Sequence, residues 1–473
     1  MAQPINKELV IVGAGPAGLA AAIRAVEGGA RVCVIDEAPA PGGQIYRQPP
    51  AAFRVPSGAA GDKDKLRGEA LLSRFRELPA GIEFMGGTAV LGLFEHKTLA
   101  LFRAGRTLEI QAEALILATG AWERSVPFPG WTLPGVFTVG GCQIMLKSQH
   151  ILPGRRVLVA GTGPLLLVLA NQLARAGAQV VAVLEASSLS GLALAPQLLW
   201  GHWGLLAEGL GHLRALRRAG IPFLQRHTIL AARGKGQVSE AVIGRLDRNW
   251  APVPGSERSL EVDALAVGFG FVPNTELTRM ALCAHRFDAE LGGWVPERGQ
   301  HMETTQPGIF AAGDGAGVAG AVVAEIEGRL AALGVLERLG KLNGETAQAE
   351  ARGPRRELRK LARFRKALDR VSLMRPGLHA LCGPETLICR CEDVPRSAVE
   401  AALAEGTRNL DNLKRRTRAG MGFCQGRVCL PFVAALAAQA GGIDEAAIGL
   451  QRPRTPLRTV TNAALASGGE ENT

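Results

Sequence analysis

The chain has 473 residues, 47% of them hydrophobic, which is enough for about three domains that each bury a core. Sixty glycines and a single tyrosine fit an α/β protein and exclude a disulfide scaffold or a disordered chain. The net charge is +11, and the segment 352–375 holds ten Arg or Lys against two acids. Because no nucleic-acid motif accompanies this segment, we expect a solvated basic helix or linker, or a surface for a partner subunit, and no nucleic-acid partner.

The cysteine usage and the apolar segments favour a cytoplasmic protein. Cys33 and Cys142 stand in apolar surroundings, as free thiols of a reducing compartment do. The apolar run from Leu9 is broken by glycines, which predicts a strand and a turn instead of a secretory signal. The charge-free stretches 126–146 and 186–207 contain too many polar residues or Pro and Gly for a membrane span. We expect them in the core or at a subunit interface, and expect membrane association only through a complex.

A strand–glycine turn–helix–strand pattern occurs twice in the chain. The first copy covers residues 9–36 and the second covers residues 157–185. Two copies favour an α/β fold with two dinucleotide-binding-like domains more strongly than a lone glycine motif does.

The first glycine turn has the complete Gly-x-Gly-x-x-Gly pattern. Its first glycine allows the tight turn, the second lets the backbone approach a pyrophosphate, and the third lets helix and strand pack closely. Asp36 ends the second strand, where a carboxylate can bind both ribose hydroxyls, and Glu37 takes this role if the strand ends one residue later. The candidate cofactor-binding residues of the turn are Gly13, Gly15, Pro16, Ala17 and Gly18.

Four motifs in chain order resemble the signatures of flavoproteins with two dinucleotide-binding domains, the fold type of thioredoxin and glutathione reductases. They are the first glycine turn with Asp36, Pro41–Gln44, Ala118–Gly120 and Phe310–Asp314. The resemblance covers roughly residues 5–340 and implies FAD at the first site. The further FAD-contacting residues that it implies are Gly43, Gln44, Thr119, Gly120, Gly313 and Asp314.

The chain lacks the redox-active cysteine pair of the disulfide reductases. No Cys-x-x-Cys or similar pair occurs upstream of residue 389, and Cys142 and Cys283 stand alone. Thioredoxin- or glutathione-reductase chemistry is therefore excluded, unless another chain supplies a thiol.

The second glycine turn is a poorer match. Gly161 and Gly163 are in place, but Leu166 stands where Gly or Ala is usual, and we expect it to push the helix off the strand and crowd a pyrophosphate. Glu185 could bind the ribose of NAD, whereas no arginine pair follows it for NADP. Either the turn binds NAD, or a retained fold has lost or altered its ligand, and the second alternative is favoured.

Four cysteines near the C-terminus form two short-range pairs, Cys389 with Cys391 and Cys424 with Cys429. Such pairs predict a tetrahedral zinc site or an iron–sulfur cluster. Because a flavin can pass single electrons to a [2Fe-2S] cluster and zinc has no redox chemistry, the cluster is favoured. The motifs around both pairs resemble the bacterioferritin-associated-ferredoxin type of [2Fe-2S] module, although small independent versions end in Cys-x-x-Cys.

The combination of these parts resembles the large A-type subunits of opine oxidase, D-hydroxyproline dehydrogenase and hydrogen cyanide synthase. The α subunits of heteromeric sarcosine oxidase and archaeal proline dehydrogenase are more distantly similar. The resemblance implies a hetero-oligomer in which a separate amine-oxidase-like FAD subunit oxidises a secondary amine or amino acid. A small ferredoxin-like [2Fe-2S] subunit is implied as well, and some relatives hold an additional flavin (FMN) at a subunit interface.

We therefore predict an oxidoreductase subunit that relays electrons through FAD and a [2Fe-2S] cluster and has no catalytic acid or base of its own. The alternative is a self-sufficient NAD(H):acceptor oxidoreductase, which needs a working second glycine turn. The predicted divisions are a first FAD-binding part (1–125), a second dinucleotide-binding-like domain (126–285), a second FAD-binding part (286–340), a basic linker (341–380) and a [2Fe-2S] domain (381–460).

Overall fold

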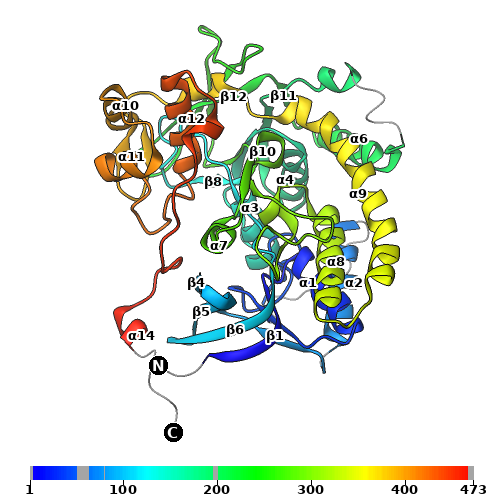
Figure 1. The fold of residues 1–473 in the computed structure, drawn as a ribbon. Helices are drawn as coiled ribbons and strands as arrows, with labels where there is room; N and C mark the ends of the chain where they lie inside the picture. Colours follow the sequence, from blue (N-terminus) through cyan, green and yellow to red (C-terminus); the bar gives the residue numbers. More distant parts are fainter. Residues whose placement is uncertain (1–3, 51–62, 79, 195–200, 467–473) are drawn as a thin grey trace.

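The structure, a computed structural model, describes residues 4–50, 63–78, 80–194 and 201–466. Two sheet-containing domains form the body of the molecule, and a small helical module that carries the C-terminal cysteines lies beside them (Figure 1). Within these ranges no helix is long and apolar enough to cross a membrane.

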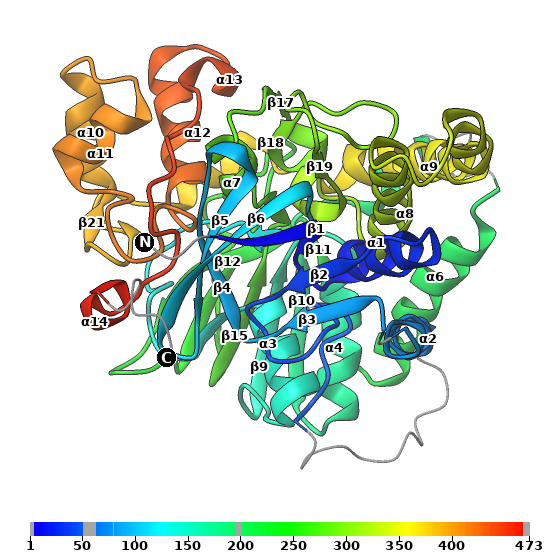
Figure 2. The same cartoon turned by 60° about the horizontal axis from the view of Figure 1, so that its bottom comes forward.

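The first domain is a sheet with the strand order β3-β2-β1-β6-β5-β4, in which β19 also pairs with β6. Successive residues of the central strands face opposite sides: Leu9 and Ile11 join a core with helices α1 and α8, whereas Val10 and Val12 join a second buried cluster. Figure 2 shows α1 and α8 side by side next to β1. The elements of this domain are β1 (Ile5–Val12), α1 (Pro16–Glu27), β2 (Val32–Ile35), α2 (Lys63–Arg76), β3 (Ile82–Met85), β4 (Thr88–Phe94), β5 (Thr98–Arg103), β6 (Arg106–Leu117), β19 (Ile309–Ala311) and α8 (Ala321–Arg338).

The second domain repeats this plan with a smaller parallel sheet. Its strand order is β11-β10-β9-β15-β8, and the antiparallel sheet β12-β13-β14 lies next to it. The charge-free stretch 126–146 buries Val126, Phe128, Trp131, Val139 and Cys142 here, and its other aliphatic and aromatic side chains are partly buried. Part of the other stretch, 195–200, lies outside the described residues. The elements are β8 (Val136–Thr138), α3 (Val139–Ile144), β9 (Arg156–Gly161), α4 (Pro164–Arg175), β10 (Gln179–Glu185), α6 (Trp203–Arg218), β11 (Phe223–Gln225), β12 (His227–Arg233), β13 (Glu240–Arg245), β14 (Arg258–Glu261) and β15 (Ala264–Gly268).

Two short strands join the domains. The chain leaves the first domain through β7 (Ala121–Glu123) and returns through β16 (Phe271–Pro273), and these strands pair antiparallel. The following helix α7 (Glu276–Met280) packs its Leu277 into the core of the first domain, as Cys283 does, so the return precedes residue 286. The hairpin β17 (His285–Asp288) and β18 (Gly293–Pro296) follows.

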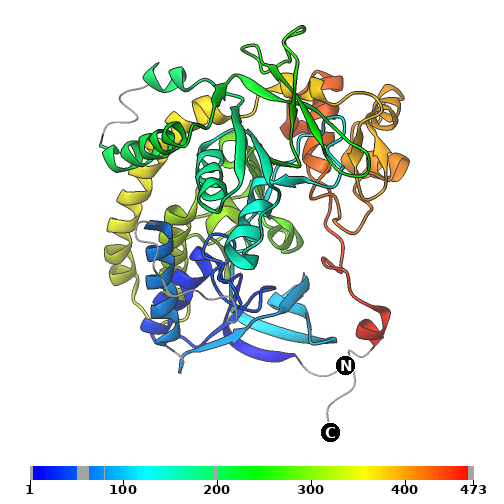
Figure 3. The same cartoon turned by 180° about the vertical axis from the view of Figure 1, so that it is seen from behind.

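The predicted basic linker is helical over most of its length. Helix α9 (Gly344–Ser372) runs along the outer side of both domains (Figures 1 and 3). Ala351, Leu358 and Leu361 recur at helical spacing and pack against α8, while the basic side chains take the exposed positions. This apolar face is sparse, and the many charges hide it in the sequence.

The C-terminal module has a core of its own. Its helices α10 (Arg396–Ala404), α11 (Leu410–Thr417) and α12 (Leu430–Gly441) bury Val399, Leu413 and Val433 around two of the cysteines. The remaining elements are β20 (Leu387–Cys389), β21 (Val394–Pro395), α13 (Glu445–Ile448) and α14 (Asn462–Ala466).

Candidate functional site

Three loops that carry predicted cofactor-binding residues meet at one edge of the first sheet. The neighbouring strands β1, β6 and β19 are parallel, so their carboxyl ends lie together. The backbone N–H of Ala118 bonds to Val12 O at 2.8 Å, and that of Ala312 bonds to Leu117 O at 3.1 Å. Ligands of open α/β sheets bind at this edge.

The first glycine turn leaves no room for side chains at two of its glycines. A Cβ on Gly13 would lie 2.2 Å from Ala118 O, and one on Gly18 would lie 1.8 Å from Gly13 O. Gly15 differs, because a Cβ there would approach only Gly43 Cα, at 3.8 Å. The second glycine thus opens a path for a ligand to the N-terminus of α1, where Pro16 and Ala17 begin the helix.

The loop that contains Gly43 and Gln44 lies over the glycine turn. Gly42 N donates to Ala14 O at 2.8 Å, and Gly43 sits so close to Gly15 that an added Cβ would come within 2.6 Å of Gly15 Cα. Gln44 is exposed. Two glycine-rich loops thus meet backbone to backbone, and backbone N–H groups are what binds a pyrophosphate in this fold type.

Asp36 ties the glycine turn to the loop after β2. Its carboxylate accepts from Ala14 N at 2.6 Å and from Ala38 N at 2.7 Å. Burial raises the pKa of Asp36, and the two backbone hydrogen bonds oppose that rise. Glu37, the alternative ribose ligand, is exposed and forms an ion pair with Arg458 of the C-terminal tail.

The loops after β6 and β19 complete the edge. Thr119 Oγ1 donates to Asn274 O at 2.7 Å, and Gly120 has open space where a Cβ would stand. Asp314 accepts from Ala319 N at 2.8 Å and from Gly320 N at 2.9 Å, and both bonds use Oδ1. Gly313 N donates to Glu327 Oε2 at 2.8 Å. The predicted FAD-contacting residues thus stand in three adjoining loops, in the first turn of α1 and in the loop after β2, at the sheet edge where a dinucleotide binds in this fold type.

The second glycine turn has the same strand–turn–helix arrangement, but different side chains surround it. Glu185 accepts from Gly163 N at 3.0 Å and Ser187 N at 2.9 Å, and burial raises its pKa. Leu166 is 1% exposed and points into the apolar core. A cavity of about 370 Å³ lies in front of the turn, and α9 closes one side with Arg365 and Asp369.

The four C-terminal cysteines pair across the two motifs. Cys389 lies at hydrogen-bonding distance from Cys429, which lowers the pKa of Cys389 to about 5, and Cys391 lies beside Cys424. Burial raises the pKa of Cys391 to about 11. Among the described residues no three His, Cys, Asp or Glu side chains converge on a single point as ligands of one metal ion. Two pairs of thiols fit the two irons of a [2Fe-2S] cluster, each of which takes two thiolates.

Tryptophan and arginine side chains fasten both cysteine motifs to the body of the protein. Trp131 donates from Nε1 to Leu387 O at 2.7 Å, and Arg390 lies 5.7 Å from the centre of its ring. Arg427, between the other two cysteines, pairs with the buried Glu276 at 2.7 Å and lies 5.2 Å from the Trp122 ring. Trp122 and Glu276 could not be predicted from the sequence, because neither stands in a recognisable motif.

The remaining cysteines have no reactive environment. Cys33, Cys142, Cys283 and Cys382 are buried and form no disulfide. Burial raises the pKa of Cys33 and of Cys142 to about 12, so both thiols stay protonated at neutral pH.

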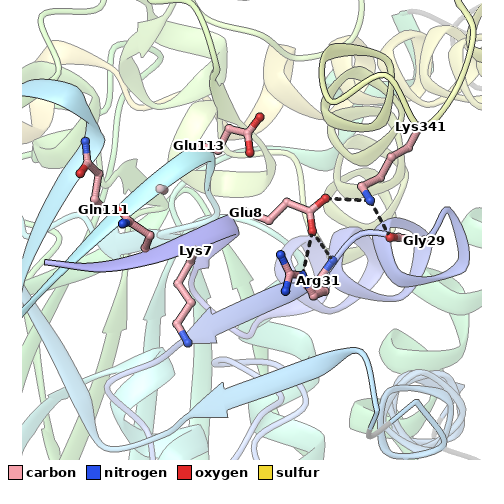
Figure 4. A pocket seen from close by; sticks show the side chains of 9 residues that line it. Lys7, Glu8, Gly29, Arg31, Gln111, Glu113 and Lys341 are labelled. Atoms are coloured by element: carbon pink, nitrogen blue, oxygen red, sulfur yellow. Dashed lines mark hydrogen bonds and ion pairs between the residues drawn. The ribbon is translucent and has the colours of Figure 1, made fainter.

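A cavity of about 690 Å³ lies away from the cofactor loops, at the amino end of β1. Figure 4 shows Glu8 bonding Arg31 and Lys341 there, and Lys341 also bonds Gly29 O. Hydrogen bonds from Lys341 and Arg31 outweigh burial and lower the pKa of Glu8. These contacts tie the segment after α8 to β1 and to the turn after α1.

Comparison with known proteins agrees with this geometry. Residues 7–328 match the family described as "Pyridine nucleotide-disulphide oxidoreductase", and residues 387–439 match the "BFD-like [2Fe-2S] binding domain". These matches imply FAD and a [2Fe-2S] cluster as cofactors.

Three relatives cover nearly the whole chain. Hydrogen cyanide synthase subunit HcnB of Pseudomonas aeruginosa is 36% identical over 99% of this chain and 100% of its own length. The A-type subunit of opine oxidase from Agrobacterium tumefaciens is 35% identical over 97% of this chain and 91% of its own length. The crystal structure of L-proline dehydrogenase from P. horikoshii has the same fold, with a TM-score of 0.69 at 21% identity over 98% of this chain and 80% of its own.

The predicted fold class and family are confirmed by these matches. The chain belongs to the pyridine nucleotide-disulphide oxidoreductase family, in the group with a C-terminal BFD-like [2Fe-2S] domain that includes HcnB and the A-type subunits of opine oxidase.

Proposed function

We propose that this chain is the electron-transfer subunit of a heteromeric dehydrogenase that oxidises a secondary amine or amino acid. The substrate class is that of opines, D-hydroxyproline, proline or glycine, and a separate amine-oxidase-like FAD subunit performs the oxidation. The names of the relatives support this, since opine oxidase and hydrogen cyanide synthase are multi-subunit enzymes by name.

One observation carries the proposal: the cysteine module is bonded directly to the flavoprotein body beside the cofactor loops. Arg427 lies between Cys424 and Cys429, and its partner Glu276 starts the helix that follows β16. Strand β16 pairs with β7, which directly follows Thr119 and Gly120. The cluster ligands and the flavin loops are thus joined by one continuous series of contacts within the chain, which supports one-electron transfer between them.

The residues of this chain bind and position cofactors. The loops around Gly15, Gly43 and Asp314 hold FAD, and FAD when bound accepts two electrons and releases them one at a time. Cys389, Cys391, Cys424 and Cys429 hold the [2Fe-2S] cluster. The Arg427 guanidinium supplies positive charge beside the thiolates, which favours the reduced form.

A self-sufficient NAD(H):acceptor oxidoreductase is the second candidate. The cavity in front of the second glycine turn favours it. The buried Leu166 and a Glu185 carboxylate already bonded to two backbone N–H groups weigh against a normally bound NAD.

We place the additional FMN, and the small ferredoxin-like subunit, at interfaces of the assembled complex in the cytoplasm.

The test is amine-dependent reduction of the assembled complex. The tagged full-length chain is isolated from the cells that make it, and FAD, FMN, iron and sulfide are determined together with its partner subunits. The complex is then mixed anaerobically with octopine, D-hydroxyproline, proline or glycine. We expect one of them to produce the EPR signal of a reduced [2Fe-2S] cluster. A chain that is isolated without a flavoprotein partner, and whose cluster is reduced by NADH and by none of these amines, would contradict the proposal.

A further inference from the structure

The two cross-motif cysteine pairs differ in their access to solvent. Cys389 and Cys429 are each 1% exposed and lie inside the core of the C-terminal module. Cys391 and Cys424 are half-buried. The pair Cys391–Cys424 is therefore the solvent-facing side of the cluster site, and any electron that leaves to another protein leaves most directly from there.

The apolar segment Met421–Phe423, which we call the tip, lies against this outer pair. Gly422 packs against Cys391 so closely that an added Cβ would lie 2.3 Å from Cys391 Cβ. Its neighbours point outward: Phe423 is 71% exposed and Met421 is 40% exposed. An aromatic ring and a methionine left in water beside a metal ligand have no use in the fold of the isolated chain, and residues of both types are enriched in protein interfaces.

Basic side chains flank the cysteine motifs in the chain. Arg390 follows Cys389, and α11 ends with Arg415 and Arg416 before Arg418, all of them exposed. Arg418 pairs with Glu392 at 2.7 Å, whereas Arg415 bonds the neutral Asn412, at 3.4 Å. The exposed Asp393 is the second acid beside the outer pair, so the three arginines Arg390, Arg415 and Arg418 leave the rim with one positive charge in sum. Such a rim attracts and orients a negatively charged partner.

We infer that the Met421–Phe423 tip and its rim of Arg390, Arg415 and Arg418 form the docking surface for an acidic one-electron carrier protein. The carrier's apolar patch covers Phe423, and its carboxylates face the arginines. One electron leaves the reduced centre held by the four thiolates and reduces the carrier, and no bond or proton moves. This inference rests on the proposed function, because it takes the cluster to be the outlet of the chain.

The inner side of the cluster site supports this direction of transfer. Arg427 bonds the carbonyl of Cys424 at 3.2 Å and joins it to Glu276 of the flavoprotein body. The side of Cys424 that meets Arg427 is therefore occupied by this chain itself. Among the described residues, Met421 and Phe423 stay exposed beside the outer pair, where a partner that takes up electrons can reach them.

The experiment uses the full-length chain and two acidic carriers as probes, a plant-type [2Fe-2S] ferredoxin and a flavodoxin. The variants are Phe423→Gln and Arg415→Glu, and Leu282→Gln is the matched control, since Leu282 is 80% exposed on another surface. Iron content and the EPR spectrum establish that each variant carries an unchanged cluster. Affinity for each carrier is then measured by isothermal titration calorimetry between low and high salt.

We expect at least one carrier to bind the parent chain, more weakly as salt rises. Both Phe423→Gln and Arg415→Glu should weaken binding at least about tenfold, and Leu282→Gln should leave it unchanged. The inference is overturned if neither carrier binds, if both variants bind as the parent does, or if the tip binds anionic phosphatidylglycerol vesicles and no carrier. A chain isolated without flavin or cluster would instead overturn the proposed function, so the two failures are distinguishable.

Discussion

The two glycine turns of this chain share one backbone arrangement and differ in the side chains around it. In each turn a proline begins the helix, and an acid at the end of the next strand accepts a backbone N–H of the turn: Asp36 from Ala14 and Glu185 from Gly163. In each, the first glycine touches a neighbouring strand end. A Cβ on Gly161 would lie 1.7 Å from Gly268 O, as one on Gly13 would lie 2.2 Å from Ala118 O.

The difference lies at the third glycine position. Gly18 packs against Gly13 O, whereas the corresponding Leu166 is buried in the core. The second turn thus keeps the βαβ frame without the third glycine. We expect cofactor binding to depend on the small residues of the turn and on the loops that face it.

Gly15→Ala should show most clearly that the two turns differ in function. The added methyl meets no backbone atom of the protein closer than 3.8 Å, so the chain still folds, but the methyl fills the path of the FAD pyrophosphate. We expect the flavin content of the purified variant to fall at least about tenfold, with the far-UV circular dichroism unchanged. The comparison variant, Gly163→Ala, strains the backbone, because Gly163 has a φ of +99°, so it should lower the melting temperature but keep the flavin. A flavin-loaded Gly15→Ala would refute the assignment.

Leu166→Ala tests whether the second turn serves the stability of the fold instead of cofactor binding. A fully buried leucine that is truncated costs about 2–5 kcal/mol of unfolding free energy. We expect that loss in urea titrations, with flavin and iron contents per folded chain unchanged. If Leu166→Ala instead created rapid reduction by NADH, the leucine would be a block on a working nucleotide site.

Asp36→Asn and Glu185→Gln compare the two acid anchors. Each change places an amide where a carboxylate accepts two N–H donors, at a cost of about 1.5–3 kcal/mol. For Asp36→Asn we expect this loss to appear as weaker FAD retention during dialysis, because the anchored turn holds the cofactor. For Glu185→Gln it should appear only as a lower melting temperature. Equal flavin loss in both variants would count against the division of roles.

The smallest effect concerns Asp369, at the mouth of the second turn. Burial raises its pKa from 3.8 to about 6, and the neighbouring Arg365 opposes that rise. Because the folded state binds this proton more tightly than the unfolded chain does, the contribution of Asp369 to stability is present below about pH 4 and is lost as the pH rises to 6. Relative to Asp369→Asn, the parent chain should lose on the order of 1 kcal/mol between about pH 4.5 and about pH 7. Urea titrations of both proteins at these pH values check this, and parallel pH profiles would contradict it.

The features that could be predicted from the sequence are those with a local pattern. Both βαβ units, the order of the flavoprotein motifs and the two short cysteine pairs depend on spacing within a few residues. A basic helix was one of the expected alternatives for α9, but its packing on α8 could not be predicted, because its apolar positions, among them Ala351 and Leu358, are outnumbered by charges. The contact of Arg427 with Glu276 joins residues 151 positions apart, and no local pattern announces it. The role of Asp36 as the anchor of the turn likewise became visible only in three dimensions.

The most direct test of the electron-relay role is an anaerobic titration of the purified chain with NADH and then dithionite, with flavin absorbance and cluster EPR followed together. The proposed role predicts that flavin and cluster are both present, that NADH reduces neither at a catalytically useful rate, and that dithionite reduces both. Rapid bleaching of the flavin by NADH, followed by the EPR signal of a reduced [2Fe-2S] cluster, would contradict it and establish a self-sufficient NAD(H):acceptor oxidoreductase.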